Sequence, residues 1–162
     1  MSLIIDGSNG LTFNNATTQA SAGSVLQVVT AATSTAITTT STTFVTTGFS
    51  ASITPKFSTS KIIIFADFGD VGIQSSSNSQ NGLGVAVYRN GSQVGANLAS
   101  QWNYSYATGY WLGSGNICYQ DSPATTSSTT YTFYYKVAGP NVTGYLFRDN
   151  TQGTIIIMEI AA

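Results

Sequence analysis

Two carboxylates, Asp67 and Asp70, are the residues of this sequence whose spacing comes closest to a catalytic or metal-binding pair. Three positions apart at the end of a predicted strand, they could serve as the acid and base of a glycosidase or hold Ca²⁺. The alternative is that both cap turns around Gly69 and Gly72, because short acidic side chains accept hydrogen bonds from nearby backbone N–H groups. Six acidic residues in the whole chain leave little to line a polysaccharide cleft, which favours the capping role.

Other catalytic and metal chemistry finds little support in the composition. The chain has no histidine, which removes the commonest general base and the commonest metal ligand together. Its only cysteine, Cys118, alternates with Ile117 and is expected to be a small core side chain. The strings Asp67-Phe68-Gly69 and Ser58-Thr59-Ser60-Lys61 match enzyme motifs but lack the companion motifs that those enzymes need. We therefore expect a non-enzymatic protein with no cofactor and no metal site.

Charge is scarce in this chain. Five basic and six acidic residues give a net charge of −1, and charged residues make up 7% of the sequence, against about 25% in an average domain. Binding to a phosphate backbone needs a cationic surface, so nucleic acid is not expected as a ligand. The longest aliphatic run, Ile62–Ala66, is far shorter than the roughly 20 residues that span a bilayer. With no signal peptide evident at the N-terminus, neither export nor membrane contact is expected.

One aromatic segment could recognise a partner. Aromatic side chains with polar tips, spaced by small residues, grip sugars and other flat groups by stacking. The alternative is that these side chains pack over the end of the fold or along an oligomer axis. The members of the segment are Trp102, Tyr104, Tyr106, Tyr110 and Trp111.

The elements that must position these residues are strands. Short runs with period-2 alternation recur along the chain from Ser24, and no window has a helical period. Asn90-Gly91 between two such runs predicts a two-residue hairpin of type I′. The predicted strands are Val25–Val29, Thr43–Val45, Phe49–Ile53, Lys61–Phe68, Leu83–Arg89, Gln93–Leu98, Gly115–Tyr119, Tyr131–Val137, Val142–Phe147 and Thr154–Ile160.

This strand spacing predicts an all-β fold, a two-sheet antiparallel sandwich of jelly-roll type formed by residues 24–162. Two of the strands, Lys61–Phe68 and Thr154–Ile160, are apolar on both faces. A strand of a monomeric sandwich needs only one apolar face, because the other meets water. The second apolar face indicates either an oligomer interface or a strand covered by loops, and the pattern does not separate the two.

Residues 1–23 differ from the rest of the chain in residue pattern, and this pattern predicts a short, extended anchor segment. Apolar pairs alternate there among turn-forming residues, without a stripe long enough to make a core. The apolar side chains of such a segment are buried against sister subunits or against the surface to which the segment attaches. The alternative is that residues 1–23 form a flexible tail. The expected attachment residues are Leu3, Ile5, Leu11 and Phe13.

The two ends of the chain carry a family resemblance. Leu11-Thr12-Phe13, followed by Thr17-Thr18-Gln19 and a small-residue linker to Gly23, resembles the opening of many small phage fibre and spike proteins. The ending Ile155–Ala162 is similar to the C-terminus of the same group, which is common in phages of aquatic bacteria, including cyanophages. The resemblance implies a homotrimer made in the bacterial cytoplasm and carried on the virion surface, with an N-terminal anchor and a C-terminal β knob. It transfers no individual functional residue.

Three functions are compatible with these expectations. The first is a capsid decoration or cement protein that binds the major capsid protein through residues 1–23. The second is a short tail fibre or receptor-binding tip, attached to a tail or baseplate protein, that grips host glycan with residues 102–111. The third, more distant, is a polysaccharide depolymerase that uses Asp67 and Asp70. The brevity of the chain favours decoration, because a tail fibre usually has a long shaft.

Overall fold

The computed structural model is almost entirely β-structure. It describes the backbone of residues 4–6, 10–12, 18–19, 25–76, 81–94, 99–105 and 108–161, and the side chains of residues 25–76, 82–94 and 108–161. The strands are β1 (Ile4–Asp6), β2 (Gly10–Thr12), β3 (Thr18–Gln19), β4 (Val25–Thr33), β5 (Ile37–Thr39), β6 (Val45–Ile53), β7 (Lys61–Ser75), β8 (Asn81–Arg89), β9 (Ser92–Gln93), β10 (Ala99–Ser105), β11 (Gly109–Asp121), β12 (Thr129–Val137), β13 (Val142–Leu146) and β14 (Gly153–Ile160). A single 3₁₀ turn, η1 (Arg148–Asn150), completes the described elements.

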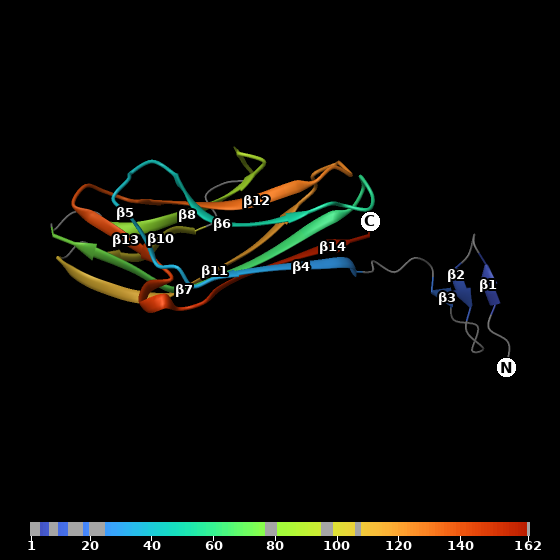
Figure 1. The fold of residues 1–162 in the computed structure, drawn as a ribbon, viewed down its shortest axis with the longest axis horizontal. Coiled ribbons are helices and arrows are strands. Elements are labelled where there is room, and N and C mark those ends of the chain that lie inside the picture. Colours follow the sequence, from blue (N-terminus) through green and yellow to red (C-terminus); the bar gives the residue numbers. More distant parts are fainter. Residues whose placement is uncertain are drawn as a thin grey trace.

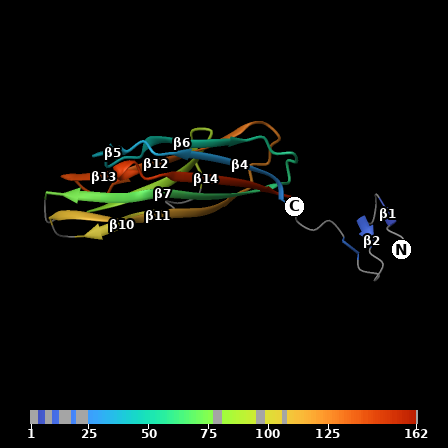
Figure 2. The same cartoon turned by 60° about the horizontal axis from the view of Figure 1, so that its bottom comes forward.

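Two antiparallel sheets form an elongated sandwich (Figure 1). The first, which we call the β7 sheet, has the order β11-β7-β14-β4, and β13 and β5 continue it beside the second half of β7. The second, the β12 sheet, has the order β10-β8-β12-β6, with β9 paired to β8. Figure 2 shows the strands of the β7 sheet running side by side along the length of the molecule.

The connectivity is that of one long hairpin wrapped into a barrel-like sandwich. The outgoing strands β4, β6, β7 and β8 pair with the returning strands β14, β12, β11 and β10, respectively, so that the first strand meets the last. This nested antiparallel pairing over two sheets is the jelly-roll topology. The predicted fold class, an all-β two-sheet sandwich of jelly-roll type, is confirmed.

Alternation of side chains assigns each strand its inner face. In β12 every second residue is buried, beginning at Thr129 and including Tyr131, Phe133 and Tyr135. The same period buries Ile155 and Ile157 of β14, while Ile156 between them faces outward.

Four phenylalanine rings join the two sheets at the centre of the core. Phe49 and Phe133 come from the β12 sheet, Phe68 comes from β7, and Phe147 follows β13. The ring centroids lie 5.0–6.2 Å apart and several pairs are edge-to-face, an arrangement that adds to the stabilisation from burial alone.

A bulge near the middle of β7 changes which residues face the core. Between Ile62 and Phe68 the even-numbered residues are buried. Beyond Gly69 the buried face instead contains the odd-numbered Val71, Ile73 and Ser75. Gly69 adopts a positive φ of 58°, and a Cβ there would lie 2.7 Å from the Thr151 hydroxyl, so only glycine fits. Thr151 Oγ1 in turn accepts the hydrogen bond from the Asp70 backbone N–H at 2.8 Å. The bulge lets one strand run from Lys61 to Ser75, well beyond the predicted end at Phe68.

Two buried carboxylates tie the layers together. Asp121 of β11 binds Arg89 Nη1 at 2.9 and 3.1 Å and accepts a hydrogen bond from the Tyr131 hydroxyl at 2.7 Å, joining the β7 sheet to the β12 sheet. Burial and this hydrogen bond raise the pKa of the Tyr131 phenol, which keeps it neutral and donating. Glu159, on the inner face of β14 beside Ile157, is fully buried and holds the β6–β7 connection.

The strand predictions are correct next to strong turn signals and wrong where the residue composition did not indicate a strand. Asn90 and Gly91 have φ values of 49° and 83° and close the β8–β9 hairpin, as predicted. No strand was predicted between Leu98 and Gly115, but β10 and β11 occupy most of residues 102–111. β5 was not expected, and residues 95–98 of the predicted strand Gln93–Leu98 lie outside the described residues.

The N-terminal strands form a separate small sheet. β1 pairs with β2 in a register that places Ile5 opposite Leu11, and β3 pairs with the other edge of β2. In both views this sheet lies beyond the end of the sandwich where β4 begins (Figures 1 and 2). Two of the expected attachment residues, Leu3 and Phe13, lie outside the described residues. The attachment role of the segment and its boundary at residue 23 stay predictions.

Candidate interaction surfaces

The outer face of the β12 sheet is rich in hydroxyl groups. Ser52 and Thr130 are cross-strand partners whose hydroxyls lie 2.7 Å apart, and Thr132 continues this polar row on β12. Farther along, the rings of Tyr88 and Tyr134 stack at 3.8 Å. Such side chains are readily solvated, so this face is suited to water.

The outer face of the β7 sheet is apolar instead. Among the described side chains, seven large hydrophobic ones are exposed, and all but Phe57 lie on this face: Val25, Val28, Phe65, Tyr110, Leu112 and Ile156. The register aligns them in cross-strand rows, with Ile156 opposite Phe65 and Phe65 opposite Cys118. We call Val28, Ile63, Phe65, Ile156 and Met158 the apolar patch. Cys118 is exposed at its border, which corrects the expectation that this thiol lies in the core.

An aromatic cluster occupies the other end of the same face. The Tyr110 and Tyr145 rings meet edge-to-face at 5.6 Å, and the Arg148 guanidinium lies over the Tyr110 ring at 4.4 Å. The Tyr145 hydroxyl donates to Gln74 Oε1 at 2.9 Å. Partial burial raises the pKa of the Tyr110 phenol, although Arg148 opposes this, so the hydroxyl stays protonated at neutral pH. The cluster thus places a partly exposed tyrosine ring and a cation next to each other on this face.

The predicted recognition segment is divided by strand alternation. Tyr110 is exposed, but Trp111 lies on the inner side of β11 and packs against the core. Trp102 lies in β10, where it pairs with Leu83 of β8, and Tyr104 lies in the same strand. Tyr106 lies outside the described residues. Tyr145 and Arg148, which join Tyr110 in space, come from sequence-distant elements and were missed; only the tertiary fold places them together.

The paired aspartates do not end a strand. Asp67 Oδ1 accepts a hydrogen bond from the Gly69 backbone N–H at 2.8 Å, which supports the bulge, as the capping interpretation of this residue predicted. Asp70 lies in the continuing strand, and Gly72 is a strand residue opposite Leu112 rather than a turn. Among the residues with described side chains, no three His, Cys, Asp or Glu side chains gather where they could hold a metal ion.

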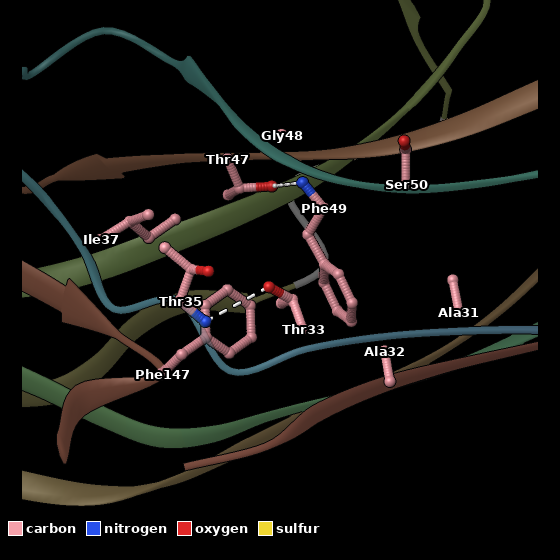
Figure 3. A pocket seen from close by; sticks show the side chains of 10 residues that line it. All are labelled: Ala31, Ala32, Thr33, Thr35, Ile37, Thr47, Gly48, Phe49, Ser50 and Phe147. Carbon is pink, nitrogen blue, oxygen red and sulfur yellow. Dashed lines mark hydrogen bonds between the residues drawn. The ribbon is translucent and has the colours of Figure 1, made fainter. Parts of the chain in front are cut away.

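A small pocket opens between the edge strands β4 and β6 (Figure 3). It has a volume of about 300 Å³. The Phe49 and Phe147 rings form its inner wall, and three threonines lie around them. Thr47 Oγ1 accepts from the Phe49 N–H and Thr33 Oγ1 from the Thr35 N–H, so these hydroxyls serve the backbone. The lining has no ionisable side chain, and the pocket therefore offers space for a small neutral group rather than catalytic chemistry.

Comparison with known proteins bears on the fold. No protein-family model matches the sequence, and no curated protein matches it. VP2 in a subviral particle of infectious bursal disease virus is similar in structure, with a TM-score of 0.50 and 14% identity over 86% of this chain and 34% of VP2. The jelly roll of this chain is shared with a viral capsid protein. The likeness is one of fold alone, and the chain spans about a third of the length of that protein.

Other particles of the same virus give weaker matches. A T=1 particle derived from it matches with a TM-score of 0.44 and 13% identity, over 99% of this chain and 44% of the matched chain. A T=13 particle matches with a TM-score of 0.43 and 13% identity, over 85% and 38%. Within the described residues, no helix is long and apolar enough to cross a membrane.

Proposed function

We propose that the chain is a non-enzymatic structural protein of a bacteriophage particle. In this proposal it is a homotrimer that decorates the capsid, bound to the major capsid protein through residues 1–23. The sandwich is then displayed at the virion surface. The observation that carries the proposal is a jelly-roll sandwich, a fold found in viral capsid proteins, preceded by a separate small N-terminal sheet.

The topology supports separate roles for the small N-terminal sheet, which would attach the protein, and for the sandwich, which would be displayed. The first jelly-roll strand, β4, begins at Val25 and is paired along its length with β14. The sandwich sheets therefore close without a strand from residues 1–23. The strands of the small sheet have only 3, 3 and 2 residues, against about 5–6 in an ordinary strand, so a partner surface is the expected source of its burial.

Deletion of residues 1–23 is expected to leave a folded sandwich that no longer attaches to particles. Among the described side chains, the buried members of the core run from Phe49 to Ile157, so the deletion leaves all of them in place. Co-sedimentation with capsids that lack the protein measures attachment, and circular dichroism measures folding. Capsid binding by the truncated protein at the level of the full chain would show that the anchor lies elsewhere.

The number of copies per particle separates decoration from a tail location. A decoration protein covers the capsid lattice and is present in hundreds of copies, whereas a tail fibre is present in a few dozen or fewer. Quantitative mass spectrometry of purified virions, standardised on the major capsid protein, gives this number. A few dozen copies would reject capsid decoration in favour of the tail.

A second candidate function is host recognition by a short tail fibre or receptor-binding tip. The specific observation in its favour is the surface cluster of exposed Tyr110 with half-buried Tyr145 and Arg148. Sugar rings stack on open aromatic faces, and the guanidinium and hydroxyl groups supply polar contacts. The substrate class would be a host surface polysaccharide.

For that second candidate, the double variant Tyr110→Ala, Tyr145→Ala should weaken binding to host polysaccharide roughly tenfold or more, since each aromatic contact is worth about 0.5–1.5 kcal/mol. Tyr134→Ala, which removes an aromatic ring from the opposite outer face, is the matched control and should bind normally. Trp111→Ala is a poor test because Trp111 packs against the core. Equal glycan-array binding by the double variant and the wild type would exclude this cluster.

A further inference from the structure

The two outer faces of the sandwich differ in a way that a monomer does not require. The β12 sheet presents hydroxyls such as Ser52 and Thr132 to water, whereas the β7 sheet leaves Val28 53%, Phe65 42% and Ile156 37% exposed. An outer face that meets only water is normally polar. Contiguous exposed apolar surface in a soluble protein marks a contact with another molecule.

We infer that the outer face of the β7 sheet is covered by further copies of this same chain, with the apolar patch at the centre of the contact. The inference rests on the homotrimer of the proposed function and identifies the surface that would form it. It also decides between the two explanations of the doubly apolar strands Lys61–Phe68 and Thr154–Ile160, since their second faces are exposed rather than covered by loops.

The chemistry of the patch favours an equally uncharged partner. Its two central cross-strand rows are Val28, Met158, Ile63 and Gln120, then Thr30, Ile156, Phe65 and Cys118. Neither row contains a side chain that is charged at neutral pH. Burying these two rows against a charged surface would desolvate the partner's charges without compensation, whereas a second copy brings the same two neutral rows. The charged Lys61 and Asp67 lie in the flanking rows, at the edge of this contact.

The size of the face is sufficient for a stable contact. β7 has 15 residues, so at about 3.3 Å per residue the face is about 50 Å long. Four strands about 4.8 Å apart make it roughly 15–20 Å wide. The whole face, including the end that carries Tyr110 and Arg148, therefore has a footprint of roughly 800 Å², close to the about 800 Å² per partner that specific interfaces bury.

The outer face of the β7 sheet also contains a hollow that can accept a side chain from a neighbouring copy of the chain. Phe65 and Ile156 line a hollow of about 450 Å³ whose walls are mainly apolar and whose polar members are Asp67, Asn116, Cys118 and Thr154. Protruding Phe65 and this hollow lie side by side on one face, so neighbouring copies can bury projecting side chains in each other's hollows. Such interlocking is how apolar interfaces reach the packing density of a core.

The test is the mass of the full-length protein in solution by light scattering. The wild type should have the mass of three copies, and Phe65→Glu, Ile156→Glu should have the mass of one, because each glutamate would be buried without a partner. Ser52→Glu, Thr132→Glu adds the same charges to the opposite outer face and should keep the wild-type mass. Circular dichroism confirms that each variant is folded.

The outcomes separate this inference from the proposed function. A trimer that persists in folded Phe65→Glu, Ile156→Glu would overturn the choice of face and leave the trimer standing. A monomeric wild type would overturn both the trimer and this inference, yet leave attachment through residues 1–23 to its own test.

The unsubstituted protein gives an independent measurement through Cys118, which borders the patch. Labelling of this thiol by a maleimide should be at least about tenfold slower in the assembled protein than after dilution to monomers, because reaction must await opening of the contact. Equal labelling rates before and after dilution would contradict the inference even if the glutamate variant failed to fold.

Discussion

Glu159→Leu is expected to lower the free energy of unfolding by about 2–4 kcal/mol, because it leaves several donors without an acceptor. The carboxylate has no exposed surface. It accepts hydrogen bonds from Ser60 Oγ at 2.6 Å, Gln27 Nε2 at 2.6 Å, and the backbone N–H groups of Lys56 at 2.7 Å and Phe57 at 3.4 Å. These contacts fix the β6–β7 connection and the start of β4 against the last strand. Urea unfolding at one protein concentration measures the loss.

The same carboxylate should make stability depend on pH. Burial alone would raise the pKa of Glu159, but the hydrogen bonds from Ser60, Gln27, Lys56 and Phe57 outweigh it and lower the pKa below the ordinary value of 4.5. A carboxyl whose folded-state pKa is depressed contributes stability that is fully present well above its unfolded pKa. This contribution is lost as the pH falls from about 5 through the folded-state pKa.

Glu159→Gln isolates that contribution, since the amide cannot titrate and turns a donor toward other donors. The difference in unfolding free energy between wild type and Glu159→Gln should be largest at pH 7 and shrink as the pH falls below about 4.5, the ordinary pKa of this carboxyl. A difference that stays the same at pH 7 and pH 3 would show that charge at Glu159 does not stabilise the fold.

Phe68→Ala should be the most damaging single truncation in the core, at about 3–5 kcal/mol. The Phe68 ring is fully buried, and its centroid lies 5.0 Å from that of Phe133 and 5.9 Å from that of Phe49, so it bridges the two sheets. A loss of this size is a large part of the about 5–15 kcal/mol that stabilises a typical domain.

Phe57→Ala is the matched control for that truncation, because Phe57 is 56% exposed and belongs to no core cluster. Its backbone N–H, which binds Glu159, is retained in the variant. The expected change is within about 0.5 kcal/mol. Similar midpoints of urea unfolding for the two alanine variants would mean that the aromatic cluster does not carry the stability assigned to it.

The parts of the fold that could be predicted are those in which local and tertiary preferences agree. Asn90-Gly91 tolerates two positive φ angles, and strict alternation of Tyr131–Val137 gives an inner and an outer face without knowledge of a partner strand. The double apolar character of Thr154–Ile160 likewise follows from its place between β4 and β7, with a core on one side and an exposed patch on the other.

Other parts depend on distant partners and could not be predicted. β11 contains three glycines, yet it forms a strand of 13 residues because it pairs with β7 along nearly its whole length. Gly69 looks like the end of a strand, but Thr151, some eighty positions later, supports the bulge that continues it. Tyr145 and Arg148 join Tyr110 for the same reason.

The wrapped-hairpin connectivity also determines the order in which the chain can fold during synthesis. The outgoing strands leave the ribosome first, but their partners are made in reverse order, and β4 must wait for β14, more than a hundred residues later. β14 then inserts between β4 and β7, at the centre of a sheet rather than at its edge. Closure of such distant pairs is slow, and until it occurs the edge of Lys61–Phe68 that pairs with β14 stays unpaired. The nascent protein therefore passes through a period when it is vulnerable to aggregation, and this period ends only with its last strand.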